Sequence, residues 1–206
     1  MPLFRSDKRL LHFAHIPKCG GTAIELYLLR SGVKTAFYDP HYFKKPAEVK
    51  WNISSPQHID SESLSRIVPV SFIDSGFAVI RNPVDRFLSA FKQYKKSGTF
   101  SNAIDINEFV QFELDTISKT VGLLDNHFLP QKNFFLVDLE YRLFRLEDGL
   151  DNVKNFIDFN FDLDNNFVSL PKLNTSSHSL SILSLSNSSL EKLEKIYKCD
   201  YESFSY

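Results

Sequence analysis

A short segment near the N-terminus carries the residue types of an anion site. Residues 15–22 read His-Ile-Pro-Lys-Cys-Gly-Gly-Thr. The apolar run 10–16 predicts a buried strand, and residues 22–30 predict a helix. Two glycines let the backbone wrap closely around an anion, and the N–H groups at a helix N-terminus attract negative charge. Lys18 adds a full charge and Thr22 a hydroxyl, so we predict that this turn binds a phosphate or sulfate group.

A second anion site is indicated further along the chain. Arg81 follows the apolar run 77–80, which predicts another strand. Asn82 and Pro83 are typical of a helix start, and Gly98 predicts its end. Ser89 lies two turns into this helix. Because ligands of open α/β sheets bind at the carboxyl ends of the strands, we predict that Arg81 and Ser89 hold a phosphate monoester.

The common nucleotide-binding patterns do not fit the first segment. In the pattern G-x-x-x-x-G-K-[ST] the lysine follows the glycines, whereas Lys18 precedes Gly20 and Gly21. The dinucleotide pattern G-x-G-x-x-G is absent as well. An ordinary ATPase or GTPase loop is therefore not matched.

The two segments together resemble sulfotransferases that use 3′-phosphoadenosine-5′-phosphosulfate (PAPS). Residues 15–22 are similar to the 5′-phosphosulfate loop of that family, and residues 80–91 to its 3′-phosphate segment. Residues 125–131 and 196–204 resemble the carbohydrate branch, sulfotransferase family 2. The resemblance implies a P-loop-like, three-layer α/β fold with a central, mainly parallel sheet flanked by helices. It also implies PAPS as the donor and a hydroxyl, expected on a carbohydrate, as the acceptor.

The resemblance implies site residues by position. Arg81 and Ser89 would hold the 3′-phosphate. Position 23 is Ala where the family often has Ser or Thr, which removes one hydroxyl contact. The 5′-phosphosulfate would lie against the segment Lys18, Cys19, Gly20, Gly21, Thr22 and Ala23.

Sulfuryl transfer to an alcohol needs a base, and histidine is the first choice because it titrates near neutral pH. We predict His58, whose position just upstream of the second strand resembles that of the family's catalytic histidine. His127 is the alternative base, or else a residue that binds substrate or braces the pocket. Lys18 is expected to stabilise the leaving phosphate. The remaining histidines are a structural pair and two loop residues: His12, His15, His41 and His178.

Metal chemistry is not expected. No cluster of His, Cys or Asp residues has the spacing of metal ligands along the chain. The two cysteines, Cys19 and Cys199, lie 180 positions apart and indicate neither a disulfide framework nor a metal site. We predict that transfer needs no metal ion.

Composition limits the class of protein. The 206 residues carry 24 Lys and Arg against 25 Asp and Glu, which gives no overall basic charge for nucleic acid. The length fits one domain spanning residues 1–206. With no apolar run of membrane-spanning length and no signal peptide at the N-terminus, we expect a cytoplasmic protein. A small-molecule or glycan acceptor is the expected partner, and the oligomeric state is not predicted.

The rest of the chain predicts further elements of an α/β domain. Strands are indicated at residues 134–137 and 141–145. Helices are indicated from residue 60, over 107–117, over 150–157 and from 188 to about 198. The Ser- and Asn-rich stretch 174–189 predicts a surface loop.

Two other functions remain open at the level of sequence. A P-loop kinase or phosphotransferase would bind ATP with Mg²⁺, and a non-catalytic protein could bind 3′-phosphoadenosine-5′-phosphate (PAP) without a base. We expect PAP to raise the melting temperature more than ATP or ADP in a thermal-shift titration. A ligand at 100 times its Kd stabilises a fold by about 2.7 kcal/mol. A larger, Mg²⁺-dependent shift with ATP would instead support the kinase.

Overall fold

The computed structural model describes residues 2–6, 9–101, 103–163, 170 and 182–206. These residues form an α/β fold around one five-stranded sheet of order β3-β1-β2-β4-β5. β2 pairs in parallel with β4, and β4 with β5, whereas β1 is antiparallel to both of its neighbours. The predicted fold class, with a mainly parallel sheet centre, is confirmed. The strands are β1 (Leu3–Arg5), β2 (Leu10–Ala14), β3 (Lys34–Ala36), β4 (Ser75–Ile80) and β5 (Tyr141–Arg145).

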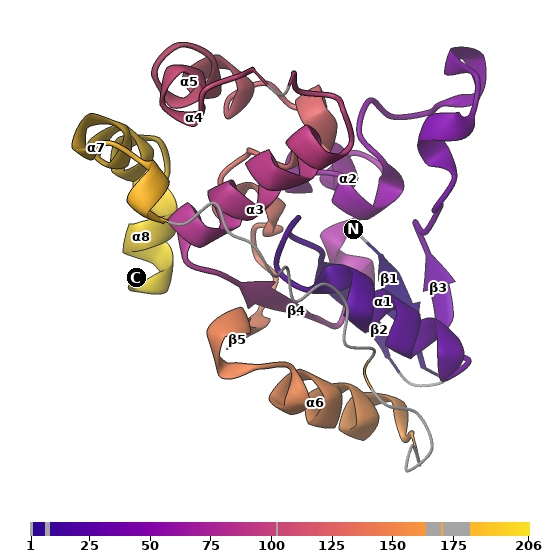
Figure 1. The fold of residues 1–206 in the computed structure, drawn as a ribbon. Helices are drawn as coiled ribbons and strands as arrows, with labels where there is room; N and C mark the ends of the chain where they lie inside the picture. The colour runs from indigo at the N-terminus through magenta and orange to yellow at the C-terminus, as the bar shows by residue number, and fades with distance from the viewer. Residues whose placement is uncertain (1, 7–8, 102, 164–169, 171–181) are drawn as a thin grey trace.

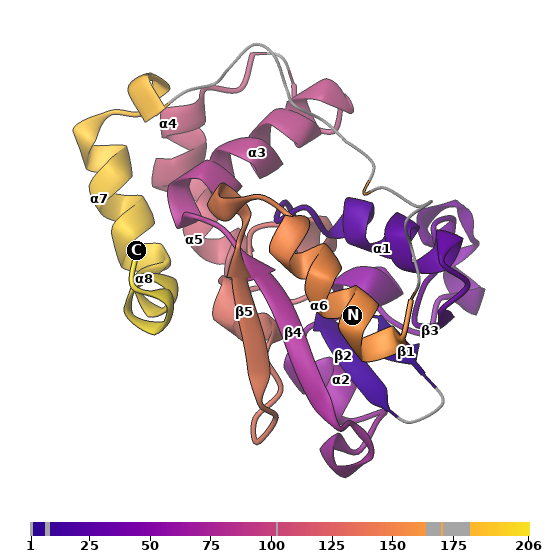
Figure 2. The same ribbon diagram turned by 90° about the horizontal axis from the view of Figure 1, so that it is seen from below.

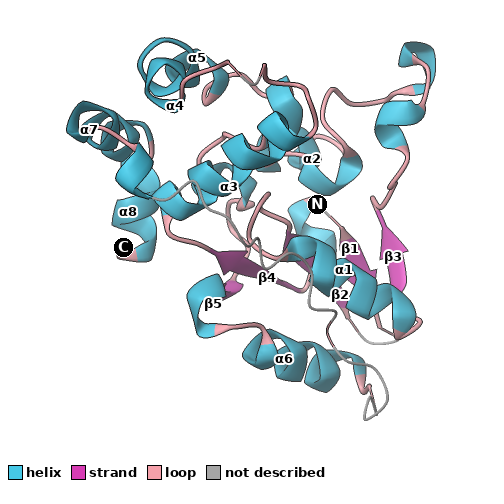
Figure 3. Cartoon of the chain, in the orientation of Figure 1, coloured by secondary structure: helices cyan, strands magenta, loops and turns pink. Residues whose placement is uncertain are grey.

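Helices flank the sheet and form a separate layer beside it (Figure 3). None of the helices in the described part of the chain combines the length and the apolar character needed to cross a membrane. The helices are α1 (Gly21–Arg30), α2 (Ser61–Ser65), α3 (Pro83–Lys96), α4 (Ile106–Glu108), α5 (Leu114–Ile117), α6 (Asp151–Phe161), α7 (Asn187–Ile196) and α8 (Lys198–Phe204).

The main core lies on both faces of the sheet. Phe13 of β2 stacks on its register partner Phe77 of β4, with ring centroids 4.7 Å apart. Phe77 in turn packs against Phe156 of α6 at 5.4 Å. Leu64 of α2 belongs to the same buried cluster. In Figures 1 and 2, α6 covers one face of the sheet and α2 lies on the other, which gives the expected three layers.

The parallel pairing of β2 and β4 brings two loops to one edge of the sheet. Ala14 and Ala78 are register partners, so both strands end on the same side. The turn before α1 follows β2, and Arg81 follows β4. Asn82 caps α3 as predicted, because its side chain accepts hydrogen bonds from Val84 N–H (3.0 Å) and Asp85 N–H (3.3 Å).

The predicted strand at residues 134–137 is wrong. A 3₁₀ turn, Gln131–Phe134, occupies the start of this stretch instead. The Asp200 carboxylate accepts hydrogen bonds from the N–H groups of Gln131 (2.8 Å) and Lys132 (2.9 Å). This tertiary contact with α8 bends the backbone into a turn that the apolar pattern alone does not show.

Other boundaries differ more modestly from the predictions. The helix predicted over 107–117 contains a π-helical stretch, Phe109–Glu113, between α4 and α5. The last predicted helix, from 188 to about 198, corresponds to α7, and α8 after Tyr197 was not predicted. The short strands β1 and β3 were not predicted, since three residues carry little periodicity. Residues 174–181 of the predicted loop lie outside the described residues. In the rest of it, Ile182–Ser184 form a 3₁₀ turn and α7 begins at Asn187.

Arg86 of α3 joins the helical layer to the chain segment that follows Asn126. Its side chain is fully buried and donates to the carbonyl oxygens of His127 (3.1 Å) and Leu129 (2.6 Å). Its guanidinium also lies 5.3 Å from the centroid of the Tyr197 ring. These contacts make Arg86 a structural residue that holds His127 in place.

We expect Arg86→Ala to lower the free energy of unfolding by about 3 kcal/mol, because two buried carbonyls lose their donor and a cavity forms. Urea denaturation measures this. Arg66→Ala is the matched control, since that side chain is 73% exposed in its pair with Glu62 and should change stability by less than about 1 kcal/mol. Equal effects of the two substitutions would contradict a structural role for Arg86.

Candidate active site

The turn between β2 and α1 has the backbone of an anion site. Lys18 and Gly20 both adopt positive φ, 70° and 81°, with Cys19 between them. Such an alternation turns successive N–H groups toward one side, which makes a concavity that suits an anion. Gly21 and Thr22 form the first turn of α1, where N–H groups have no intrahelical acceptor. The N–H of Ala23, in contrast, is bonded to the Gly20 carbonyl at 3.1 Å.

The buried side chain of His15 packs against this turn. A Cβ added at Gly21 would lie 2.0 Å from Nε2 of His15, so only glycine fits there. His15 Nδ1 lies 2.8 Å from Oε1 of Glu25 on α1, and both side chains are buried. Burial lowers the pKa of His15, which favours the neutral ring with Nδ1–H donating to Glu25. His15 thus holds the turn against α1, in line with a structural role.

Arg81 is hydrogen-bonded to the same turn. Its Nη1 donates to the carbonyl of Lys18 at 3.2 Å. Its backbone is held by the side chain of Gln131, which accepts from Arg81 N–H (3.0 Å) and donates to Arg81 C=O (2.8 Å). The two segments that the sequence assigns to the two ends of one nucleotide therefore lie in direct contact at one edge of the sheet.

Lys18 contacts α3 one helical turn beyond Ser89. Gln93 lies one turn after Ser89 on the same helix face, and its Oε1 accepts a hydrogen bond from Nζ of Lys18. The face of α3 that carries Ser89 is therefore turned toward the phosphate-loop side of the site. Burial, and after it the charge of Arg81, lowers the pKa of Lys18. Positive charge is concentrated where an anion would bind.

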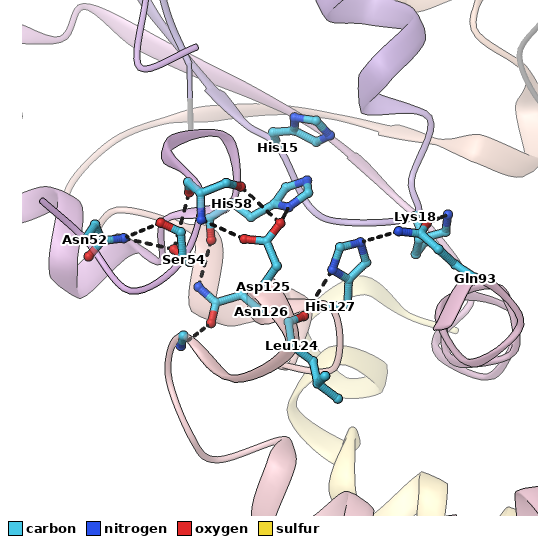
Figure 4. A network of polar contacts seen from close by, with 12 residues as sticks. His15, Lys18, Asn52, Ser54, His58, Gln93, Leu124, Asp125, Asn126 and His127 are labelled. Carbon is cyan, nitrogen blue, oxygen red and sulfur yellow. Dashed lines mark hydrogen bonds and ion pairs between the residues drawn. The ribbon is translucent and has the colours of Figure 1, made fainter. Parts of the chain in front are cut away.

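His58 is paired with a carboxylate that the sequence analysis did not select. Its Nδ1 lies 2.7 Å from Oδ2 of Asp125. The same carboxylate accepts from the Ser55 N–H at Oδ1 (2.7 Å) and from the Ser55 hydroxyl at Oδ2 (3.1 Å) (Figure 4). Burial opposes ionisation of Asp125, but the charge and hydrogen bond of His58 outweigh it and lower its pKa to about 2. The carboxylate fixes the proton on Nδ1 and leaves Nε2 of His58 free to accept a proton.

His127 lies beside His58 in a different environment. The two ring centroids are 5.0 Å apart. His127 Nδ1 lies 3.1 Å from the carbonyl of Leu124, and Nε2 lies 3.5 Å from Nε2 of Gln93. Burial, followed by the charge of His58, lowers the pKa of His127 to about 3. So weak a base accepts a proton poorly at neutral pH, which favours His58 as the base and His127 as a bracing residue.

Glu25, Gln93 and Asp125 were not predicted as site residues from the sequence. Asp125 stood in the segment 125–131 that supported the family resemblance, but its partner His58 is 67 residues away. Gln93 and Glu25 lie on helix faces in the regular pattern of α3 and α1, where a polar residue carries no signal of its own. His15, expected as a structural residue, also lies edge-on to His58 with centroids 4.8 Å apart. His12 is buried and contacts Tyr141 Oη, and His178 lies outside the described residues.

Folding also assembles a group that spacing along the chain did not reveal. One ligand atom each of His58, Asp125 and His127 lies within 4.8 Å of the others, an arrangement that could hold a metal ion. Residues far apart in the sequence thus form a group that ligand spacing along the chain does not reveal. The same three side chains already have protein partners, and the absence of a metal requirement stays a prediction.

The comparison with protein families identifies the class. A sequence model described as the sulfotransferase family matches residues 1–206, the whole chain. The protein therefore belongs to the sulfotransferase family, and the predicted resemblance to sulfotransferase family 2 is confirmed. No significant match was found among curated proteins or among solved structures.

The Asp125–His58 pair makes stability depend on pH in a defined direction. A carboxyl whose pKa falls from 3.8 to about 2 on folding stabilises the fold above pH 4, and this contribution is lost as pH drops toward 2. We expect the stability difference between wild type and Asp125→Asn to shrink by about 2 kcal/mol from pH 5 to pH 2. Chemical denaturation at several pH values measures it, and a constant difference would contradict the pairing.

Proposed function

We propose that this chain is a single-domain enzyme that transfers the sulfuryl group of PAPS to a hydroxyl of a small-molecule or glycan acceptor. One observation supports this proposal above the others. The turn that contains Lys18 is hydrogen-bonded to Arg81, so two anion sites at one sheet edge lie within reach of one nucleotide. The His58–Asp125 pair is connected to the same edge through His127, Gln93 and Lys18.

The residues of this edge fit the donor. The N–H groups of Gly20, Gly21 and Thr22 and the ammonium of Lys18 would hold the 5′-phosphosulfate. Arg81 and Ser89 would hold the 3′-phosphate, with the guanidinium supplying a charge-assisted bond. Cys19 is buried with its Sγ 3.6 Å from Oε1 of Gln131, and Ala23 is buried with its N–H already bonded, so these two residues shape the turn.

In the proposed reaction His58 Nε2 takes the proton of the acceptor hydroxyl. The acceptor oxygen forms a bond to sulfur as the bond between sulfur and the 5′-phosphate oxygen breaks, and PAP leaves. Lys18 stabilises the negative charge that develops on that oxygen. Asp125 keeps His58 in the productive tautomer and stabilises its protonated form, much as a carboxylate supports a histidine base in other enzymes.

The acceptor class and the cellular location are proposed from the sequence. The family resemblance supports a carbohydrate hydroxyl as acceptor, and the cytoplasmic location expected from the sequence is proposed with it. Both are part of the proposal. No metal ion is required by the proposed reaction, since Lys18 and the helix N-terminus provide positive charge at the leaving group.

We expect His58→Ala to lower kcat by about 10²- to 10⁴-fold, because the base is lost while the donor site remains. The measurement uses labelled PAPS with a panel of glycan, phenol and lipid acceptors, together with a thermal-shift titration with PAP. His41→Ala, at an exposed loop position, is the control and should leave turnover unchanged.

Two results would change the assignment. Full turnover in His58→Ala, with loss of turnover in His127→Ala, would move the base to His127. Arg81→Ala probes the donor site separately, since it should weaken PAP more than the analogue that lacks the 3′-phosphate. Unaltered discrimination between these two ligands would show that Arg81 does not bind the 3′-phosphate.

A further inference from the structure

A hollow at the other end of the sheet from the candidate active site gathers three cations. Its volume is about 630 Å³, and it is lined by the exposed residues Arg5, Arg9 and Lys34. The C-terminal end of α6 lines it as well. A hollow of this size is in the range of small-molecule sites. We call it the distal hollow.

Strand pairing places the distal hollow far from the phosphate turn. Arg9 precedes β2, whereas the turn with Lys18 follows it. β1 is antiparallel to β2 with Arg5 opposite Leu10, and β3 is antiparallel to β1 with Lys34 opposite Arg5. All three cations therefore lie at the amino end of β2. The five residues of β2 span about 17 Å, so the distal hollow is separate from the candidate donor site.

Arg5 and Lys34 are like charges placed directly opposite each other. Register partners on an antiparallel pair point to the same face of the sheet, and two like charges there destabilise the pairing. In the part of the chain that the structure describes, neither side chain lies within ion-pair distance of a carboxylate. Arg9 is held by a neutral group, since its Nη1 donates to Oδ1 of Asn160 at 3.2 Å. The fold thus keeps an unfavourable pair of charges where a bound anion would relieve the repulsion.

Few negative groups face these cations. Asp162 is the one carboxylate among the described residues that line the distal hollow. Asp74 lies at the same end of the sheet, but it is not among the lining residues and accepts from the Leu10 N–H at 2.7 Å. The end of α1 offers little free carbonyl charge, because the carbonyls of Leu28 and Leu29 already accept hydrogen bonds from residues that follow the helix. Positive charge therefore exceeds negative charge in the distal hollow.

We propose that the distal hollow is a second anion site, which binds a small molecule carrying phosphate or sulfate groups. Arg5 and Lys34 bind the anionic group together, and its negative charge relieves their mutual repulsion. Arg9 adds a third positive charge beside them. Phe159, which is 80% exposed at the wall of the hollow, supplies apolar surface for the rest of the molecule. This site is independent of the donor site and so of the proposed function.

Titration of matched sugars into the PAP-saturated protein tests this proposal. Glucose 6-phosphate, glucose 6-sulfate and glucose differ only in the anionic group, and PAP keeps the donor site occupied. By titration calorimetry we expect both anionic sugars to bind at least about tenfold more tightly than glucose. The tighter of the two identifies phosphate or sulfate as the preferred group. Arg5→Thr and Lys34→Thr should each weaken the binding of that sugar about tenfold and leave PAP affinity unchanged.

The same substitution at Lys34 should stabilise the unliganded protein. Lys34→Thr removes the like-charge pair and keeps a residue type that favours strands, so we expect the melting temperature to rise by about 1–3 °C at low salt. At about 1 M salt, where the screening length falls to about 3 Å, this gain should disappear. An unchanged or lower melting temperature of Lys34→Thr at low salt would contradict the repulsion.

Arg142→Thr is the matched control, because Arg142 is an exposed arginine of the edge strand β5 and lies opposite Phe77 rather than another cation. It lies outside the distal hollow and should keep full binding of the preferred sugar. Equal binding of all three sugars, unchanged binding in both Arg5→Thr and Lys34→Thr, or an equal loss in Arg142→Thr would each overturn the proposal. Failure of the proposed function is seen separately, as a wild-type melting temperature that PAP does not raise.

Discussion

The parallel pairing of β2 with β4 is the constraint on which the candidate site depends. It places the turn after β2 and Arg81 after β4 at one edge of the sheet. Gln131 then locks this arrangement. Its side chain is fully buried and bonds both backbone groups of Arg81, while its own N–H is held by Asp200 of α8. The C-terminal helix thus contributes to the geometry of a site assembled from residues far earlier in the chain.

Three imidazoles packed side by side would repel one another if all were protonated. The structure avoids this by giving them different partners. His15 lies against Glu25, His58 against Asp125, and His127 has only neutral groups at its two nitrogens. Burial of His127 disfavours its charged form. The carboxylate of Asp125 lies beside His58 and can balance a positive charge on that ring. A cluster of similar side chains thereby acquires three different electrostatic environments, and this difference is the basis for proposing His58 as the base.

Much of this could be predicted from local sequence. The strand before Pro17, the glycines of the turn and the Asn82–Pro83 start of α3 each leave a short-range signal, and all three were confirmed. Lys18 and Arg81 could be predicted as anion-binding residues because each is a cation at the carboxyl end of a strand, where ligands of α/β sheets bind. Asp125 did not stand out, because a single carboxylate in a polar loop looks like any other until its distance from His58 is known. The strand expected at 134–137 is wrong for the same reason, since the hydrogen bond that the Gln131 N–H donates to Asp200 cannot be seen in the apolar pattern.

Residue types and their spacing over a few positions were enough to indicate the α/β class, the two anion-binding segments and the sulfotransferase resemblance. These features are local, because helix caps, glycine turns and strand ends are set by neighbouring residues. The pairing of His58 with Asp125, the contact of Arg81 with the Lys18 carbonyl and the bracing of Gly21 by His15 joined residues of separate segments. Such contacts depend on strand order and core packing. Only the folded chain therefore decided which polar side chains meet, and that the carboxylate of Asp125 pairs with His58.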